Sequence, residues 1–519
     1  MRFLISIVAA LLIGGLVVAR AETPDTAALY AEHCAECHGA DRLGGMGTPL
    51  LPENLGRLPK DKAIEVIADG RPAVQMPAYE GSLDDAEIKA LVDFIYTPLD
   101  AIPQWKLPEM NASHIIHNDP AGLPETPKHN ADPLNLFTVV ETGDHHVSIL
   151  DGDSFETLWR FKSRFALHGG AKYSPDGRFV YLASRDGWVS KYDLFSFKTV
   201  AEIRIGINTR NIAVSGDGRW VAAGNTLPHT LVIMDSETLK PVKIIPVIGK
   251  DGTPSRVSAV YTAPPRNSFI AALKDIPEIW EMSYEDDPEP VPQGLIHNYQ
   301  PGMEEGAFDY GPFPVRRIIL DDYLDDFFFD QSYVNLIGAA RNGKNGQVVN
   351  MRVGRKIADL DLSGMPHLGS GITFEYEGRP VMATPHLKDA VISVIDLKSW
   401  KTIKRIETKG PGFFMRSHDN TPYAWTDVFF GPNKDLLHII DKRTLEIVKT
   451  LKPAPGKTGA HVEFTRDGKF ALVSVWDMDG ALVIYDAETF KEVKRIKMVK
   501  PSGKYNVFNK ITYSSGTSH

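Results

Sequence analysis

The stretch FKSRFALHGGAKYSPDGRFVYLASRDGWVSKYDLFSFKTVAEIRIG, residues 161–206, decides the fold of most of the chain, because its pattern returns further along. It contains an apolar strand, an Asp-Gly turn, a second strand, a third strand ending in Asp, and a fourth strand after a short turn. The same order recurs in residues 210–247 and 461–498. Four short strands in about 40 residues are the unit of a β-propeller blade.

Weaker copies of this unit occur before and between the three clear ones in the sequence. They occupy residues 135–161, 257–282, 334–351, 379–406 and 421–451. We count eight blades in all, so residues 135–519 are predicted to form an all-β eight-bladed propeller. The terminal stretch YNVFN (505–509) is expected to supply a strand that closes the ring. A propeller is a scaffold, so this fold alone assigns no function.

A different motif lies near the N-terminus, in the stretch AALYAEHCAECHG (27–39), which holds the only two cysteines of the chain. Cys-x-x-Cys followed directly by His is the attachment signature of c-type haem. Cys34 and Cys37 would each bond a haem vinyl group, and His38 would be the proximal iron ligand. A redox Cys-x-x-Cys motif, the alternative, usually follows a β-strand in a βαβ unit, whereas the flanks here are helical.

A c-type haem iron often takes a Met thioether as its second axial ligand. Met76 is the favoured candidate, because Pro follows it and an amphipathic helix comes next; Met46, in a Gly-rich loop, is the alternative. Ser82 is predicted to cap that helix, and apolar residues recur in it at helical spacing. Residues 22–98 are therefore predicted to be a small all-α class I cytochrome c domain.

The first 21 residues have the pattern of a signal peptide, with Arg2, an apolar run and the sequence Ala-Arg-Ala. An uncleaved anchor is the alternative, because the apolar run is long. We expect a periplasmic protein with no membrane contact in its mature form. A net charge of −9 argues against a nucleic-acid partner. Residues 99–134 are rich in Pro, Asn and His and are predicted to be a linker.

Five histidines of the propeller lie near the start of a blade's first or second strand, and such positions converge on the axis. They are His168, His367, His386, His418 and His461. We expect them to share one end of the central channel. Histidine is suited to proton transfer and to iron ligation, since its pKa lies near working pH.

The combination of a short c-type domain and this propeller resembles the cytochrome cd1 family. The similarity lies in ALHGGAKYSPDGRFVYLASRDGWVSKYDL, IGINTRNIAVS, LVIMDSETL, MPHLGSGITF, VSVWDMDGALVIYDAETF and PSGKYNVFN, which together span the propeller. The resemblance implies that the propeller holds haem d1 or a precursor. It further implies His168 as proximal iron ligand, Arg185 and Arg210 as partners of the macrocycle carboxylates, and Tyr261 nearby.

The family includes at least two activities. One is nitrite reduction, which uses two distal histidines; one matches His367, and the other position is near Asp325, where a carboxylate would repel nitrite. The other is the last step of haem d1 synthesis, in which dihydro-haem d1 is oxidised and a propionate becomes an acrylate. The short N-terminal region, the missing distal His and the additional His461 favour this second activity. A non-catalytic haem d1 carrier is a third possibility.

Roles for the site residues follow from that resemblance and from the chemistry. His461 is the expected base, and His367 the distal ligand or a substrate-positioning group; these two roles could be exchanged. Haem c, held by Cys34, Cys37, His38 and Met76, would carry electrons to a soluble acceptor. Cytochrome cd1 nitrite reductase is the expected recipient of the finished haem d1.

Overall fold

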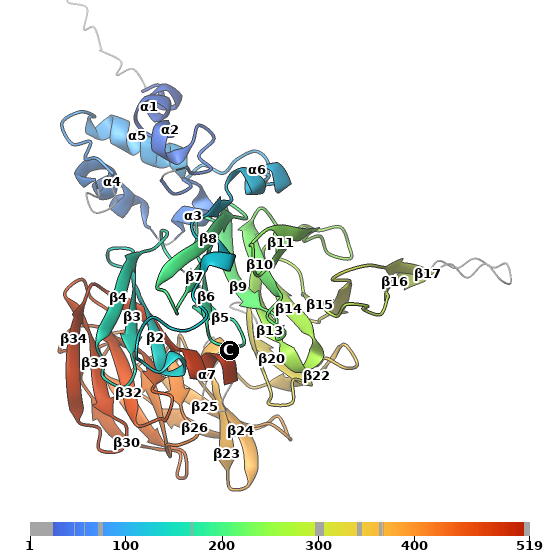
Figure 1. Ribbon diagram of the computed structural model, residues 1–519, viewed down its shortest axis with the longest axis vertical. Coiled ribbons are helices and arrows are strands. Elements are labelled where there is room, and N and C mark those ends of the chain that lie inside the picture. Colours follow the sequence, from blue (N-terminus) through green and yellow to red (C-terminus); the bar gives the residue numbers. More distant parts are fainter. Residues whose placement is uncertain are drawn as a thin grey trace, which may run out of the picture.

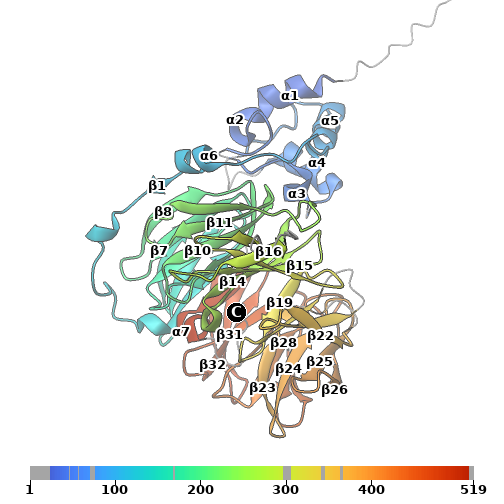
Figure 2. The ribbon, with the colours of Figure 1, turned by 90° about the vertical axis from the view of Figure 1, so that its right-hand side faces the viewer.

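The computed structural model describes residues 24–45, 47–56, 58–70, 76–167, 170–295, 306–339, 345–362, 366 and 368–512. A helical unit at the N-terminus lies over one side of a large ring of β-sheets, as two perpendicular views show (Figures 1 and 2). The C-terminal end of the described chain returns to the ring beside its first strands (Figure 1). The predicted pairing of a small helical domain with an eight-bladed propeller is confirmed.

The described residues of the helical unit form five α-helices around a small apolar core. They are α1 (Thr26–His33), α2 (Ala35–His38), α3 (Pro52–Leu55), α4 (Lys60–Asp69) and α5 (Asp85–Ile95). Helix α5 buries Ile88, Leu91, Val92 and Ile95, which are the positions that its helical spacing predicts. They pack against Tyr30 of α1 and against residues of α4.

The start of α5 differs from the prediction by two residues. The N-cap is Asp84, and the prediction of Ser82 was wrong. The Asp84 carboxylate accepts a hydrogen bond from the Glu87 N–H at 2.8 Å, and the Glu87 carboxylate accepts one from the Asp84 N–H at 2.8 Å. This reciprocal capping box satisfies two backbone donors, whereas the Ser82 hydroxyl donates to the carbonyl of Tyr79.

Between the helical unit and the ring, the chain follows the outside of the propeller. It forms α6 (Leu107–Ala112), β1 (Ile115–Ile116) and the 3₁₀ turns η2 (Pro120–Gly122) and η3 (Pro133–Asn135). Strand β1 pairs with the outer strand of a blade, Ile115 opposite Glu202. Histidines of this segment donate to propeller groups, His114 to the carbonyl of Thr238 and His129 to that of Leu194.

Eight antiparallel sheets form the ring. Blade 1 is β35 (Pro501–Asn506), β2 (Leu136–Glu141), β3 (His146–Asp151) and β4 (Thr157–Lys162). Blade 2 is β5 (Lys172–Tyr173), β6 (Phe179–Ala183), β7 (Trp188–Asp193) and β8 (Lys198–Arg204). Blade 3 is β9 (Asn208–Val214), β10 (Trp220–Leu227), β11 (Thr230–Asp235) and β12 (Pro241–Pro246). Blade 4 is β13 (Val257–Ala263), β14 (Ser268–Leu273), β15 (Glu278–Ser283) and β18 (Val315–Ile319).

The second half of the ring repeats the same order. Blade 5 is β19 (Asp326–Phe329), β20 (Asn335–Ala339), β21 (Gly346–Asn350) and β22 (Arg355–Leu360). Blade 6 is β23 (Ile372–Tyr376), β24 (Arg379–Pro385), β25 (Val391–Asp396) and β26 (Thr402–Glu407). Blade 7 is β27 (Met415–Ser417), β28 (Tyr423–Asp427), β29 (Leu437–Asp441) and β30 (Glu446–Leu451). Blade 8 is β31 (Gly459–Phe464), β32 (Phe470–Val475), β33 (Gly480–Asp486) and β34 (Glu492–Met498).

The ring closes through β35, which pairs with β2 from the opposite end of the chain. The predicted closing stretch 505–509 is strand only as far as Asn506. The helix α7 (Val507–Thr512) follows, because the Asn506 side chain accepts a hydrogen bond from the Asn509 N–H at 3.2 Å and so begins the helix. The closing strand itself covers residues 501–506.

Blade 4 contains an insertion that the repeat pattern did not predict. Strands β16 (Val291–Leu295) and β17 (Gly306–Asp309) form a separate two-stranded sheet between β15 and β18. This hairpin projects away from the ring (Figure 1). The fourth strand of the blade therefore comes about 30 residues after the third, which is why the repeat in residues 257–282 had only three strands.

First strands of neighbouring blades contact one another, so they line the axis of the ring. The outer strands are half exposed, as the alternating burial of β22 shows. No described helix combines the length and the apolar character that are needed to cross a membrane.

Candidate functional site

The cytochrome motif lies where α1 passes into α2. His38 ends α2, and its Nδ1–H donates to the carbonyl of Thr48 at 2.7 Å. This bond fixes the tautomer in which Nε2 can bind an iron. Burial also lowers the pKa of His38, which favours the neutral imidazole that a metal needs. An added Cβ on Gly47 would lie 2.7 Å from the ring, so the loop packs closely against it.

The thiols have properties unlike those of a redox pair. Burial, with the neighbouring Cys37, raises the pKa of Cys34 to about 11. A redox Cys-x-x-Cys motif needs a lowered pKa at its attacking thiol. Cys34 and Met76 both pack against the core of the helical unit. Cys34, Cys37, His38 and Met76 therefore fit a covalently attached haem c with a His and a Met ligand, while Met46 lies outside the described residues.

A second group of polar side chains gathers at the axis of the propeller. All come from first strands or from segments next to them, and four of the ten are buried while the others are partly buried. They are Lys172, Arg210, Tyr261, Asp326, Arg416, His461, Glu463, Lys504, Tyr505 and Lys510. Buried charges cost free energy unless they are paired or bind a ligand, so this concentration marks a binding site.

His461 is held in an unusual backbone conformation within β31. Its φ is 51°, and the strand pairing shifts register between Ala460 and Val462. A bulge of this kind turns a side chain away from its regular direction. The ring contacts Phe414 and Tyr505, with centroids 4.6 and 5.2 Å away.

The charges around His461 keep its imidazole neutral. Burial, with the positive charges of Lys504 and Arg416, holds the pKa of His461 well below its usual value. Its Nδ1 has no hydrogen-bond partner among the described residues, and the same is true of the buried Nε of Arg416. The Nε–H of Arg416 is thus a donor that an anionic ligand could accept from, and the Nδ1 of the neutral His461 ring is available as a proton acceptor.

The cations of this channel outnumber its carboxylates. Lys504 donates to the hydroxyl of Ser474 at 2.9 Å, and Lys510 lies 3.7 Å from Glu463. Burial, with the positive charge of Arg416, lowers the pKa of Lys172 to about 8 and that of Lys510 to about 7. A ligand with several carboxylates would supply the missing negative charge.

Arg210, a predicted carboxylate partner, and Tyr261, predicted to lie nearby, are on adjacent blades. Arg210 of β9 donates from Nε to the carbonyl of Ser258 at 2.9 Å, and Tyr261 of β13 donates to Asp326 at 3.1 Å. The Tyr261 ring has the Lys172 ammonium 5.5 Å from its centre. Burial, followed by the Asp326 charge, raises the pKa of Tyr261 well above its usual value, so the phenol stays protonated.

Arg185 lies further out, in the turn between β6 and β7, where the helical unit meets the ring. Its N–H donates to the carbonyl of Ala166 at 3.2 Å, and its own carbonyl accepts a bond from Asn54 of α3 at 3.5 Å. The structure thus places Arg185 between the two parts of the chain.

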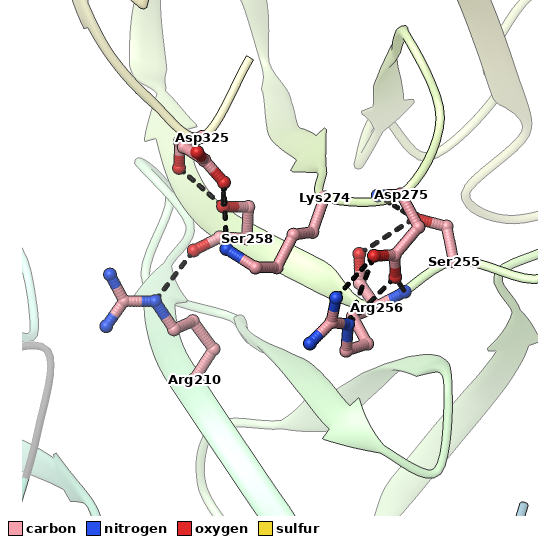
Figure 3. A network of polar contacts seen from close by, with 7 residues as sticks. All are labelled: Arg210, Ser255, Arg256, Ser258, Lys274, Asp275 and Asp325. Atoms are coloured by element: carbon pink, nitrogen blue, oxygen red, sulfur yellow. Dashed lines mark hydrogen bonds and ion pairs between the residues drawn. The ribbon is translucent and has the colours of Figure 1, made fainter. Parts of the chain in front are cut away.

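Asp325 belongs to a network of polar contacts between blades 4 and 5 (Figure 3). Its carboxylate pairs with Lys274 at 3.0 Å, and the Ser258 hydroxyl donates to its carbonyl at 2.6 Å. Ser258 in turn accepts the bond from Arg210. The sequence suggested that a carboxylate at this position would repel nitrite. In the structure this carboxylate is paired with Lys274.

The expected cluster of five histidines is only partly described. His168 and His367 lie outside the described residues. His386 is buried and shares a hydrogen bond with the Ser393 hydroxyl at 2.9 Å. His418 follows the last residue of β27, beside Gly468, whereas Phe414 precedes β27 and contacts His461. His418 is therefore at the opposite end of the strands, and its expected place beside His461 was wrong.

Eight residues at or beside the axis were not assigned from the sequence. They are Lys172, Asp326, Arg416, Asp427, Glu463, Lys504, Tyr505 and Lys510. Arg416 and Glu463 each lie in a stretch that is rich in apolar residues, FFMRSH and GAHVEF. A charge inside a strand that is predicted to be fully buried is the pattern that could have identified them. The Asp427 carboxylate also accepts the N–H of His461 at 3.3 Å, and burial raises its pKa to about 6.

Comparison with known families agrees with both parts of the fold. The family described as Cytochrome D1 heme domain matches residues 131–301 and 304–510. The family described as Cytochrome C oxidase, cbb3-type, subunit III matches residues 21–95.

Individual relatives extend over nearly the whole chain. The dihydro-heme d1 dehydrogenase of Pseudomonas aeruginosa is 54% identical and matches 99% of this chain and 100% of its own length. The nitrite reductase of Stutzerimonas stutzeri is 26% identical and matches 98% of both chains. A solved structure of dihydro-heme d1 dehydrogenase NirN in complex with DHE superposes with a TM-score of 0.87 at 55% identity, covering 93% of this chain and 99% of that one. The chain therefore belongs to the cytochrome d1 haem-domain family.

Proposed function

We propose that this chain is a dehydrogenase that oxidises dihydro-haem d1 to haem d1. One observation carries the proposal: a buried, neutral imidazole at a cationic propeller axis occurs in the same chain as a haem c attachment site. The similarity to a dihydro-heme d1 dehydrogenase over the whole length supports it. Nitrite reduction has less support, because the identity to nitrite reductase is 26% and that to the dehydrogenase is 54%. A pure carrier role has less support, because a carrier would not need the haem c attachment site.

The reaction converts a –CH2–CH2– unit of a propionate side chain into –CH=CH–, and releases two protons and two electrons. We assign His461 as the base that accepts a proton from the side-chain carbon. Its orphaned Nδ1 is able to accept one, since the ring is neutral. The substrate itself would make the ring more basic, because its carboxylates offset the repulsion from Lys504 and Arg416.

The cationic groups of the axis would bind and orient the macrocycle. Arg210 and Arg185 are assigned to its carboxylates, as the resemblance implies, together with the buried Arg416 and Lys504. An Arg guanidinium offers a planar fork of donors that suits a carboxylate. Tyr261 would donate from its phenol. His168 and His367 are proposed as the iron ligands of the macrocycle, proximal and distal.

Tyr505 would shape the pocket beside the base. Its ring packs edge-on against His461, and burial raises the pKa of Tyr505 to about 12. The phenol is therefore neutral at working pH. The rings of Tyr505 and Phe414, which both contact His461, would exclude water from the carbon that loses the proton.

Cys34, Cys37, His38 and Met76 would hold haem c. Bound haem c supplies one-electron transfer, which would remove the two electrons singly and pass them to a soluble acceptor.

The domain organisation, the location and the further partners complete the proposal. Residues 1–21 would be a signal peptide, 22–98 the cytochrome c domain, 99–134 a linker and 135–519 the propeller. The protein would act in the periplasm, and cytochrome cd1 nitrite reductase would receive the product.

The test is to incubate the haem c-loaded protein with dihydro-haem d1 and an electron acceptor, and to measure the mass of the extracted macrocycle by mass spectrometry. Loss of two hydrogens is expected. His461→Gln should reduce the rate about 10²- to 10⁴-fold, the usual contribution of a general base. His418→Gln is the matched control and should turn over at the parent rate. An unchanged macrocycle mass would support the carrier, and parental turnover by His461→Gln would remove His461 from the mechanism.

A further inference from the structure

Arg204, at the end of β8, connects three parts of the chain. It is 5% exposed. Its Nε donates to the carbonyl of Asp186 at 2.9 Å, and its NH2 nitrogen donates to the carbonyl of Leu43 in the helical unit at 2.5 Å. Its guanidinium lies 4.4 Å from the centre of the Trp105 ring, and the Trp105 indole donates to the Arg204 carbonyl.

The peptide group that receives this bond continues toward the haem motif. The carbonyl of Leu43 accepts from Arg204, and the N–H of the same peptide unit, that of Gly44, donates to the carbonyl of His38 at 2.8 Å. Gly44 has a φ of 83°, and an added Cβ would meet Pro49 at 2.9 Å and Arg204 at 3.1 Å. One peptide unit therefore joins a propeller cation to the proximal histidine.

The residues that follow also enclose His38. We call the described residues 43–45 and 47–48 the proximal loop. The Gly47 N–H donates to the carbonyl of Cys37 at 2.7 Å, and the Thr48 carbonyl accepts from the His38 ring. The ring, its backbone and the preceding cysteine are thus all held by the loop that Arg204 contacts. A displacement of this loop would change the hydrogen bond that sets the basicity of the ligand.

Beyond the proximal loop, the chain is fastened to the propeller again. Leu51 is 1% exposed and packs with Ile207 and Leu227 of blade 3. Asn54 donates to the carbonyls of Arg185 at 3.5 Å and Ile207 at 3.4 Å. These contacts involve no charged side chain. Removing one of them therefore tests the effect of docking alone, without a change in electrostatics.

The charge of Arg204 has little compensation. Among the described residues, no carboxylate oxygen lies within 4.0 Å of its guanidinium, although the Asp186 side chain is near enough to influence it. Its partners are carbonyls and an indole face. A positive charge in such a low-dielectric setting stabilises the reduced state of a neighbouring redox centre, because that state carries one more electron.

We propose that Arg204 is a positioning residue for the cytochrome site: it fixes the proximal loop around His38 and raises the reduction potential of haem c. Docking on the propeller would thereby make the helical unit a better electron acceptor. The inference rests on the proposed function only for the direction of electron flow. The link itself requires only a haem bound at Cys34 and Cys37.

The experiment is a redox titration of haem c in the full-length protein without macrocycle. In Arg204→Met, the ratio of reduced to oxidised haem at a fixed ambient potential should fall about threefold to tenfold, where tenfold corresponds to 59 mV for one electron. Arg204→Lys keeps the charge, so in this variant the ratio of reduced to oxidised haem should fall less than in Arg204→Met. Asn54→Ala, the control, removes docking bonds without charge and should keep the parent ratio.

Two results would overturn the proposal. One is a parental potential in Arg204→Met. The other is an equal fall in Asn54→Ala, which would assign the effect to docking alone. The absorption spectrum of each variant reports whether Met76 still binds the iron, and Arg204→Lys provides the comparison if Arg204→Met does not fold. Because no macrocycle is present, the result is independent of the proposed dehydrogenase activity.

Discussion

The two sites of this molecule are built in opposite ways. The haem c attachment motif is one contiguous stretch, Cys34 to His38, with Thr48 ten residues beyond the histidine and Met76 in a later segment. The propeller site takes its side chains from strands that are spread from β5 to β35 and from α7. The contiguous site is held by covalent attachment, and the distributed site is held by the closure of the ring. The difference predicts that substitutions in the haem c motif should abolish haem attachment completely and leave the propeller unaffected. Substitution of single residues in the propeller site should reduce macrocycle binding only in part.

The largest effect is expected from Cys37→Ala combined with Cys34→Ala. Without the thiols, haem c cannot be attached covalently, and turnover of dihydro-haem d1 should be lost. The propeller should still bind the macrocycle, since its blades need nothing from the motif. Haem staining of a denaturing gel reports the attachment, and absorbance titration reports the binding. Loss of macrocycle binding in this variant would show that the two sites are not separable.

Removal of a single axial cation should have an intermediate effect. Arg416→Met should weaken binding of dihydro-haem d1 about tenfold to a hundredfold, the range for a buried hydrogen bond to a charged group. Arg416 is 3% exposed and has an orphaned Nε. Arg443→Met is the matched control, because the Arg443 side chain is 67% exposed and pairs with Asp441 at the surface. Equal affinities of the two variants would exclude Arg416 from the binding site.

Binding should also take up protons. The pKa values of Lys172 and Lys510, about 8 and about 7, lie below the usual value for lysine, so at pH 8 part of each side chain is neutral in the empty protein. Carboxylates of the ligand would raise both values, and protons would then bind from solution. Calorimetry at pH 8 in two buffers of different ionisation enthalpy measures the number of protons taken up on binding. Proton release would contradict the assigned cationic pocket.

The smallest effect concerns Asp325. Asp325→Asn removes the ion pair with Lys274 but keeps a side chain that can accept from Ser258. The Lys274 and Asp325 side chains are 30% and 17% exposed, so we expect a loss of only about 1 kcal/mol in the free energy of unfolding. Denaturant unfolding measures this loss. A large fall in dehydrogenase rate at unchanged stability would instead place Asp325 in the reaction.

The same contrast explains what the sequence could predict. Cys34, Cys37 and His38 are recognisable because the chemistry requires a fixed spacing, and the blades because the Asp-Gly turn recurs in each clear repeat. Two features are not readable from the sequence. The bulge at His461 depends on the register of β31 against β32 within blade 8, and the pairing of Asp325 with Lys274 depends on a contact between blades. The cap of α5 was missed because two acceptors, Ser82 and Asp84, precede the helix and only the second has Glu three residues later.

Lys504 and Arg416 show a different limit. Their charges are visible in the sequence, but whether a strand is innermost depends on the closure of the ring by β35. Arg204 has the same limit, since its partners Leu43 and Trp105 are about 100 residues or more away in the chain.

The most direct test of the account is the direction of electron flow. Protein with oxidised haem c would be mixed with dihydro-haem d1 without oxygen or any acceptor, and the haem c absorbance followed in time. The account predicts that haem c becomes reduced, and that the reduction is about 10²- to 10⁴-fold slower in His461→Gln. Haem c that stays oxidised while the macrocycle is converted, or that is reduced equally fast in His461→Gln, would contradict it.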